Sequence, residues 1–219
     1  MGQYYIPILI SEDGSIRTLY SHEYDNGLKL MEHSYIGNDF VNAVLTEIWR
    51  SPARVAWIGD YSDDVCGDLY EKKLPREDFM RYYAAAWCKG REALRIHPEP
   101  RNILTMRIKR RYLMNHTQKI YIHIGEYIAA NRWTEQGAWK NGRYDPFATY
   151  DMCINPLPLL TACGNNRGGG DYRSGHPGFD QVGSWAFDLI ECTDRLPETD
   201  YKKVDCRFSE QCQTKTVVV

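Results

Sequence analysis

The stretch ILTMRIKRRYLMNHTQKIYIHI, residues 103–124, indicates the fold class of this chain more clearly than any other. In residues 103–114 and 119–124 apolar and polar residues largely alternate, and a short polar break at residues 115–118 separates the two runs. Two such runs around a short turn are typical of an antiparallel β-hairpin. A hairpin at this place argues against a doubly wound α/β fold, whose parallel strands need helical crossovers.

The flanking sequence predicts further strands and two clear helices. The strands are expected over residues 3–10, 15–20, 54–61, 149–154 and 183–192, with a turn at Gly14 between the first two and a polar loop over 131–147. One helix is expected over residues 38–50 with Asn38 or Asp39 as its N-cap, and a second from Pro75 to Gly90. The second helix should bury a stripe consisting of Phe79, Tyr82, Tyr83, Ala86 and Trp87.

This order of elements predicts a single α+β domain. Strands joined by hairpins, without regular strand–helix–strand units, imply an antiparallel or mixed sheet with two or three helices. We expect the domain to cover residues 1–195. A polar tail, residues 196–219, should follow it and end in an edge strand.

The composition is that of a soluble globular protein. Of the 219 residues, 43% are hydrophobic and 26% are charged, and the formal net charge is −2. This balance gives no reason to expect nucleic acid or a membrane surface as the partner. No apolar run approaches the roughly 18 residues of a membrane span, and the N-terminus lacks the basic region of a secretion signal. We therefore expect a cytoplasmic protein.

The cysteines point to the same compartment. There are seven of them, an odd number, and no two have the spacing of a zinc site. Reduced thiols in the cytoplasm are the simplest interpretation. The sequence therefore predicts neither disulfides nor a cofactor.

A glycine-rich stretch, GNNRGGGDYRSGHPGFDQVGSW (164–185), contains seven of the 17 glycines of the chain. Loops of this kind can cradle a phosphate with their backbone N–H groups. The stretch lacks the Lys-Ser or Lys-Thr of a Walker A loop, and a strand rather than a helix should follow it. It is either a sharply turning surface loop or a binding loop. In the second case the binding residues would be Arg167, Gly168, Gly169, Gly170, Asp171, Tyr172 and Arg173.

Three other groups of residues could carry chemistry. His33, Asp60 and His176 are candidates for acid–base catalysis, although a buried structural role is the simpler interpretation of His33. An acidic loop could bind a hard cation, or it could simply be solvated; its carboxylates are Asp60, Asp63, Asp64 and Asp68. On the first strand of the hairpin, alternation places three basic residues on one face: Arg107, Lys109 and Arg111. This face could bind phosphates or an acidic protein, or it could simply be the solvent-exposed side of the sheet.

Several stretches of the chain occur together in one group of proteins. They are MGQYY (1–5), GLKLMEHSYIGN (27–38), VAWIGDYSDD (55–64), YLMNHTQKIYI (112–122), PLPLLTACGNNRGGGDY (156–172) and VGSW (182–185). As a set they resemble an uncharacterised family of proteins from bacteriophages, prophages and gut bacteria. The resemblance implies a mobile-element setting and no particular reaction. At Asn155 this chain departs from the histidine expected in that family.

Three functions remain open from the sequence. The first is a phage accessory protein that binds a host protein, for example an inhibitor of a bacterial defence system, acting in the host cytoplasm. The second is an enzyme or binder acting on a nucleotide or other phosphorylated ligand through residues 164–176. The third is a small nucleic-acid-binding module that uses the basic strand, against which the balanced overall charge argues.

Overall fold

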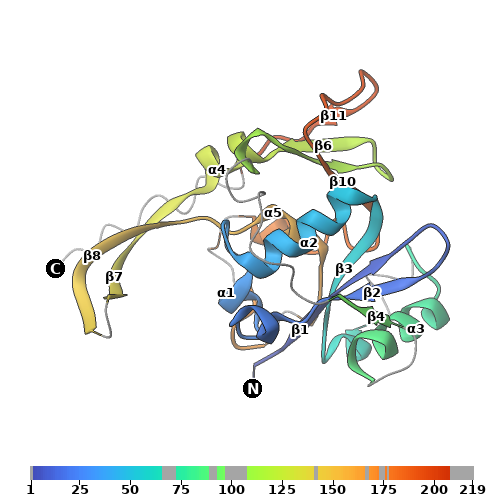
Figure 1. The fold of residues 1–219 in the computed structure, drawn as a ribbon, viewed down its shortest axis with the longest axis horizontal. Coiled ribbons are helices and arrows are strands. Elements are labelled where there is room, and N and C mark those ends of the chain that lie inside the picture. The colour runs from blue at the N-terminus through green and yellow to red at the C-terminus, as the bar shows by residue number, and fades with distance from the viewer. Residues whose placement is uncertain are drawn as a thin grey trace.

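The computed structural model describes residues 2–65, 73–88, 93–96, 108–140, 143–165, 168–172, 176 and 178–207. These residues form a mixed sheet in the order β11-β6-β5-β10-β3-β1-β2-β4, with β9 paired to β3, and a separate two-stranded sheet, β7-β8 (Figure 1). The strands of the larger sheet are β1 (Tyr5–Ile10), β2 (Ile16–Thr18), β3 (Ala53–Gly59), β4 (Ala93–Arg95), β5 (Tyr112–Asn115), β6 (Ile120–His123), β9 (Ala162–Cys163), β10 (Leu189–Thr193) and β11 (Lys202–Lys203). The α+β class with a mixed sheet is confirmed.

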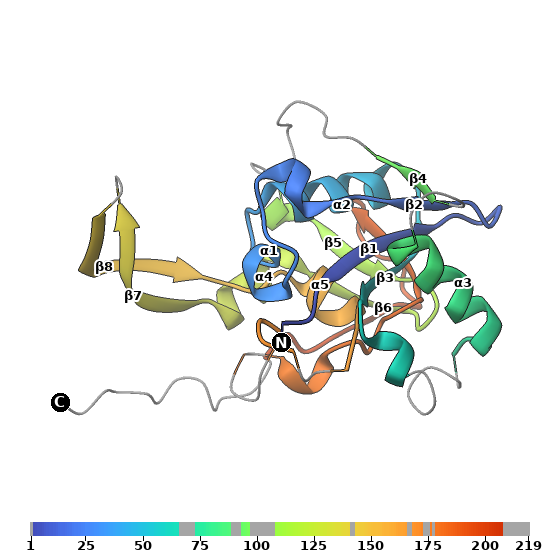
Figure 2. The ribbon, with the colours of Figure 1, turned by 90° about the horizontal axis from the view of Figure 1, so that it is seen from below.

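Helices cover both faces of the sheet at its centre, where β1 pairs with β3 (Figures 1 and 2). The α-helices of the described residues are α1 (Leu30–His33), α2 (Asp39–Arg50), α3 (Arg76–Trp87), α4 (Ile124–Asn131) and α5 (Pro156–Thr161). Because strand side chains alternate, Val55 and Trp57 belong to the core formed with α2 and α5. Ala56 and Ile58 point the other way and pack with Phe79 of α3. Both central strands are therefore almost entirely buried.

The two long helices follow the sequence prediction. The side chain of Asn38 accepts hydrogen bonds from the backbone N–H groups of Phe40 and Val41, which makes it the N-cap of α2. Helix α3 begins after Pro75 and ends at Trp87, because the backbone of Cys88 is extended; Gly90, the predicted end, lies outside the described residues. Within the predicted stripe of α3 only Phe79 is fully buried, and the other members are half-buried.

The hairpin that indicated the fold class is present but shorter than predicted. Strands β5 and β6 pair antiparallel, with Leu113 opposite Ile122. Residues Ile108–Arg110 form a 3-10 turn and not part of the first strand, and residues 103–107 lie outside the described residues. The predicted last strand is also shorter: β10 begins at Leu189, and residues 183–188 form turns.

Residues 131–147 were predicted to be a loop, and this was wrong. Strands β7 (Trp133–Lys140) and β8 (Arg143–Met152) form an antiparallel hairpin over this region. Both ribbon views show the hairpin projecting away from the rest of the protein (Figures 1 and 2). We call residues 133–152 the β7–β8 arm. Its base is fixed where Cys153 and Ile154 enter the core and Ile154 forms a bridge with Tyr35.

The segment after residue 195 returns to the sheet. Strand β11 pairs in parallel with β6 at the edge, and Cys206 is buried, its carbonyl accepting a hydrogen bond from Asn131 Nδ2. Residues 208–219, which include the expected end of the tail, lie outside the described residues. The five described cysteines are free, namely Cys88, Cys153, Cys163, Cys192 and Cys206, whereas Cys66 and Cys212 are not described. Among the described helices, none has both the length and the apolar character that crossing a membrane requires.

Candidate functional site

The described part of the glycine-rich loop packs against its own domain. The Asp171 side chain is buried and accepts a hydrogen bond from Gly168 N at 3.0 Å, while Asp171 N donates to Gly168 O at 3.3 Å. The Gly170 carbonyl accepts from Met31 N at 2.9 Å, and Asn165 N donates to the side chain of Gln3 at 3.2 Å. A phosphate cradle needs free N–H groups, but these two N–H groups in the loop, at Gly168 and Asp171, already have partners.

Two of the glycines are explained by this packing. A Cβ at Gly168 would lie 2.5 Å from the backbone nitrogen of Gln3, so a side chain there would collide with the N-terminal segment. Gly170 has φ +95°, in the left-handed region that favours glycine. The glycines therefore let the chain turn and approach the N-terminal segment closely. Arg167 and Arg173, the expected charge partners of a ligand, lie outside the described residues.

The close approach at Gly168 leads to a stability prediction. Gly168→Ala should lower the free energy of unfolding by about 1–3 kcal/mol, because the added methyl group overpacks against backbone that cannot rotate away. Gly14→Ala is the control: Gly14 has φ +81°, but no atom lies within 4 Å of the position its Cβ would take, so only the left-handed conformation is penalised, by about 1 kcal/mol. Urea denaturation measures both. Equal losses would show that the contact with Gln3 does not constrain position 168.

His33 lies in the core with both ring nitrogens engaged. Its Nδ1 lies 3.0 Å from the Gly27 carbonyl, and Trp57 Nε1 donates to its Nε2 at 3.1 Å. Nδ1 therefore carries the proton and the ring is neutral. Burial lowers its pKa to about 4, against the weaker opposite effect of the Gly27 carbonyl and Glu32. This geometry supports the structural interpretation of His33 and leaves no ring nitrogen for a substrate.

Of the remaining acid–base and metal candidates, Asp60 and Asp63 lie close enough to interact electrostatically. Burial raises the pKa of Asp60, whose carboxylate accepts from Tyr4 N at 3.0 Å. Asp63 is exposed, the placement of the Asp64 side chain is not described, and Asp68 lies outside the described residues. Among the described residues, no group of three or more potential ligands could hold a metal ion. His176 is half-buried, and its carbonyl accepts from Phe179 N at 3.2 Å.

The prediction of an exposed basic strand face was wrong for the two residues that can be assessed. Lys109 is exposed but lies in a 3-10 turn rather than on a strand. Arg111 is buried, and its guanidinium stacks 4.8 Å from the ring centre of Trp49. Arg107 lies outside the described residues. Alternation alone missed this because the 3-10 turn changes the direction of each side chain.

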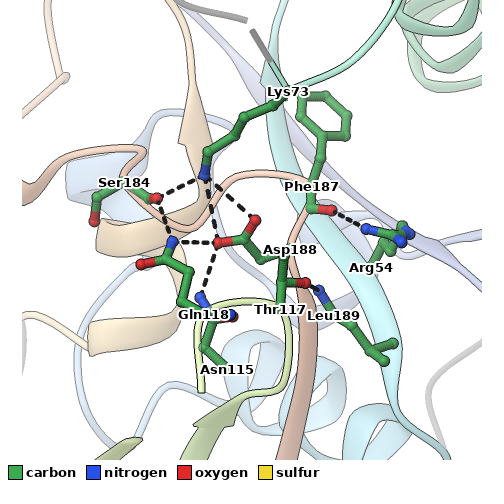
Figure 3. A network of polar contacts seen from close by, with 9 residues as sticks. All are labelled: Arg54, Lys73, Asn115, Thr117, Gln118, Ser184, Phe187, Asp188 and Leu189. Atoms are coloured by element: carbon green, nitrogen blue, oxygen red, sulfur yellow. Dashed lines mark hydrogen bonds and ion pairs between the residues drawn. The ribbon is translucent and has the colours of Figure 1, made fainter. Parts of the chain in front are cut away.

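A polar cluster around Asp188 was not predicted (Figure 3). The carboxylate is buried and accepts from Asn115 Nδ2 at 2.8 Å and from Gln118 Nε2 at 2.5 Å. Lys73 Nζ lies 3.3 Å from Asp188 Oδ1 and donates to the Ser184 carbonyl at 2.8 Å. These donors offset the loss of water around a buried charge. The cluster thereby fixes the β5–β6 turn against the segment that precedes β10.

The backbone beside Asp188 is strained. Phe187 has φ +64°, which is rare for a bulky residue. Its N–H donates to the Val55 carbonyl at 2.8 Å, and its own carbonyl accepts from Arg54 Nη1 at 3.1 Å (Figure 3). Such a conformation persists only where the surroundings hold it in place. Here these contacts place the Phe187 ring against Tyr82 and Phe79. The strained backbone conformation therefore positions the ring that packs against α3.

The β7–β8 arm is the largest feature that the core does not explain. Its described side chains are mostly exposed, and Phe147 is 84% exposed, the highest value among the large hydrophobic residues described. Tyr150, on the same strand, is 42% exposed. Polar contacts such as Thr134 Oγ1 to Asp151 at 2.9 Å join the two strands. An isolated two-stranded ribbon is at best marginally stable in water.

The backbone edges of the arm are a second feature. Among the described strands, none pairs with β7 or β8 except the other. Unpaired strand edges present N–H and C=O groups that another chain can bind. The arm is therefore the candidate functional surface. Comparison with known proteins adds nothing to this assignment, since the chain matches no family, no curated protein and no solved structure.

Proposed function

We propose that this chain acts by binding another protein, with the β7–β8 arm as the contact surface. The observation that carries the proposal is the exposure of Phe147, 84%, on a ribbon that projects from the core. Large aromatic side chains are enriched at protein interfaces. Burying Phe147 and the open strand edges in a complex would supply the stabilisation that a lone ribbon lacks.

The partner in this proposal is a bacterial host protein, for example a component of a defence system. The support for it is the sequence resemblance to bacteriophage and prophage proteins, which implies an accessory protein acting in the host cytoplasm. A groove that accepts one aromatic side chain, next to an exposed strand edge, would fit the arm.

The other two functions have less support in the described residues. A phosphorylated ligand at residues 168–172 would meet the Asp171 carboxylate, and the N–H groups of Gly168 and Asp171 already have partners. A nucleic acid would need the basic strand face, and Arg111 is buried. Binding through the arm requires neither a free phosphate-binding loop nor an exposed basic strand face.

Co-purification with two matched variants tests the proposal. Phe147→Asp introduces a charge on the arm, whereas Leu196→Asp does so at a site that is 80% exposed and lies outside the arm. We expect a tagged chain and its Leu196→Asp variant to recover the same protein from a bacterial lysate. Phe147→Asp should recover at least about 10-fold less, as for a central aromatic contact. Equal recovery by all three proteins would refute the role of the arm.

A further inference from the structure

Three ionisable side chains from distant parts of the chain form a line at the end of the β5–β6 hairpin. His116 Nε2 lies 2.9 Å from Glu191 Oε2, and His116 Nδ1 lies 2.6 Å from the Tyr201 hydroxyl. His116 is in the turn, Glu191 is on β10 and Tyr201 immediately precedes β11. The side chains of His116 and Glu191 are 25% and 23% exposed, so the line is open to solvent and to small molecules.

The contacts determine which atom carries each proton. An ionised Glu191 can only accept, so His116 Nε2 carries a hydrogen and donates it. In the neutral ring Nδ1 then has a free lone pair, and the Tyr201 hydroxyl donates to it. A carboxylate, an imidazole and a hydroxyl in this order form the arrangement that activates a nucleophilic oxygen in hydrolases.

A cation lies beside the same hydroxyl. Lys119 Nζ is 3.4 Å from the Tyr201 oxygen and 4.6 Å from the centre of its ring. Lys119 also forms an ion pair with Asp200 at 3.3 Å. The ammonium group would stabilise negative charge that develops on the phenol oxygen or on an atom bonded to it.

Hydrogen bonds within the β5–β6 turn and to β10 fix the position of His116. The turn that carries it is held by Asn115, whose side chain donates to Asp188 and accepts from Gln118 N at 2.9 Å (Figure 3). Leu189 N donates to Thr117 Oγ1 at 2.9 Å, and His116 N donates to the Leu189 carbonyl at 2.9 Å. These bonds set the register between the turn and β10, and therefore the distance between His116 and Glu191. Support of this kind is what a functional group needs to stay in place.

We infer that Tyr201 is a nucleophile that accepts an acyl group from an uncharged ester. The phenol oxygen attacks the carbonyl carbon, and its proton passes to His116 Nδ1. The bond between the carbonyl carbon and the ester oxygen then breaks, and the departing oxygen takes the proton from His116. The products are O-acyl-Tyr201 and an alcohol. Among the described contacts of the site, Glu191 and Asp200 contribute two carboxylates and Lys119 one ammonium group, so an uncharged ester fits better than a phosphate ester.

Acetylation by p-nitrophenyl acetate tests this inference on the full-length chain. Peptide mapping by mass spectrometry gives the rate at each tyrosine, and Tyr4 and Tyr150, both 42% exposed, serve as internal references. Tyr201 is half-buried and is therefore less accessible to the reagent than these two references. We expect it nevertheless to react at least about 10-fold faster, because a positioned general base accelerates such steps by roughly 100-fold or more.

Two variants separate activation from mere accessibility. Glu191→Gln and His116→Gln should each slow acetylation of Tyr201 by about 10-fold or more and leave Tyr4 and Tyr150 unchanged. Melting curves identify a variant that does not fold, and in that case the other variant decides. The inference is overturned if Tyr201 reacts no faster than the two references, or if the folded variants react as fast as the unsubstituted protein.

Discussion

Replacing Trp57 by alanine is expected to lower the free energy of unfolding by about 3–5 kcal/mol. Trp57 is fully buried at the centre of β3. The centres of its ring and of the Phe40 ring are 6.3 Å apart, in an edge-to-face arrangement. Its loss leaves a cavity between α2 and the sheet. It also removes the hydrogen bond that Trp57 Nε1 donates to His33 Nε2.

Two controls resolve these contributions. Trp57→Phe keeps much of the ring and removes the N–H donor, so it should lower the free energy of unfolding by about 1–3 kcal/mol, the penalty of an unsatisfied buried acceptor. Trp87→Ala acts on the half-buried stripe of α3 and should be less severe than Trp57→Ala. Equilibrium denaturation in urea measures all three. A larger loss for Trp87→Ala would contradict the assignment of the main core.

The second large effect is a loss of stability in mild acid. His33 has a pKa lowered to about 4, whereas in the unfolded chain the ring has its ordinary value near 6.5. The unfolded chain therefore takes up this proton first as the pH falls. The stability that the neutral, buried His33 contributes is fully present above pH 6.5 and is lost as the pH falls from about 6.5 to 4. At about 1.36 kcal/mol per pKa unit, the loss is on the order of 3 kcal/mol.

A variant without the imidazole isolates this effect from other groups that titrate in acid. His33→Gln should be less stable at neutral pH but should lose less stability than the unsubstituted protein between pH 6.5 and 4. The measurement is the free energy of unfolding at several pH values in that window. If both proteins lose stability in parallel, His33 does not titrate as its burial requires.

The sequence predicted those parts of the fold in which local signals agree with burial. Helix α2 has apolar residues at helical spacing and an Asn38 side chain suited to capping, and the structure has both. The turn at Gly14 was predicted from the positive φ that it requires, and φ is +81°. Such features need only neighbouring residues in the chain, so a single sequence is enough to identify them.

The predicted strand at 149–154 overlaps the end of β8, but the rest of the β7–β8 arm was missed because its described side chains bury neither face. A strand is recognised by alternation of apolar and polar residues, which reports one buried face. The described arm side chains are mostly exposed, so its sequence reads as a polar loop. The arm also contains a bulge between Gln136 and Ala138, which interrupts any regular alternation.

The polar clusters around His116 and Asp188 could not be predicted from the sequence for a different reason. Glu191 and Tyr201 lie 75 and 85 residues from His116 in the chain, and Lys73 lies 115 residues from Asp188. No short motif spans such distances. The sequence did single out the glycine-rich loop, but the reason for Gly168 is the backbone of Gln3, at the other end of the chain. In both cases the explanation is a tertiary neighbour.

Photo-crosslinking from the arm tests the proposed function most directly. A photoreactive amino acid is placed at position 147 and, in a control protein, at position 196, and each chain is irradiated in bacterial lysate. The proposal predicts one prominent adduct with a bacterial protein from position 147, at least about 10-fold stronger than from position 196. The same weak adducts from both positions, or an adduct only with a second copy of this chain, would contradict it.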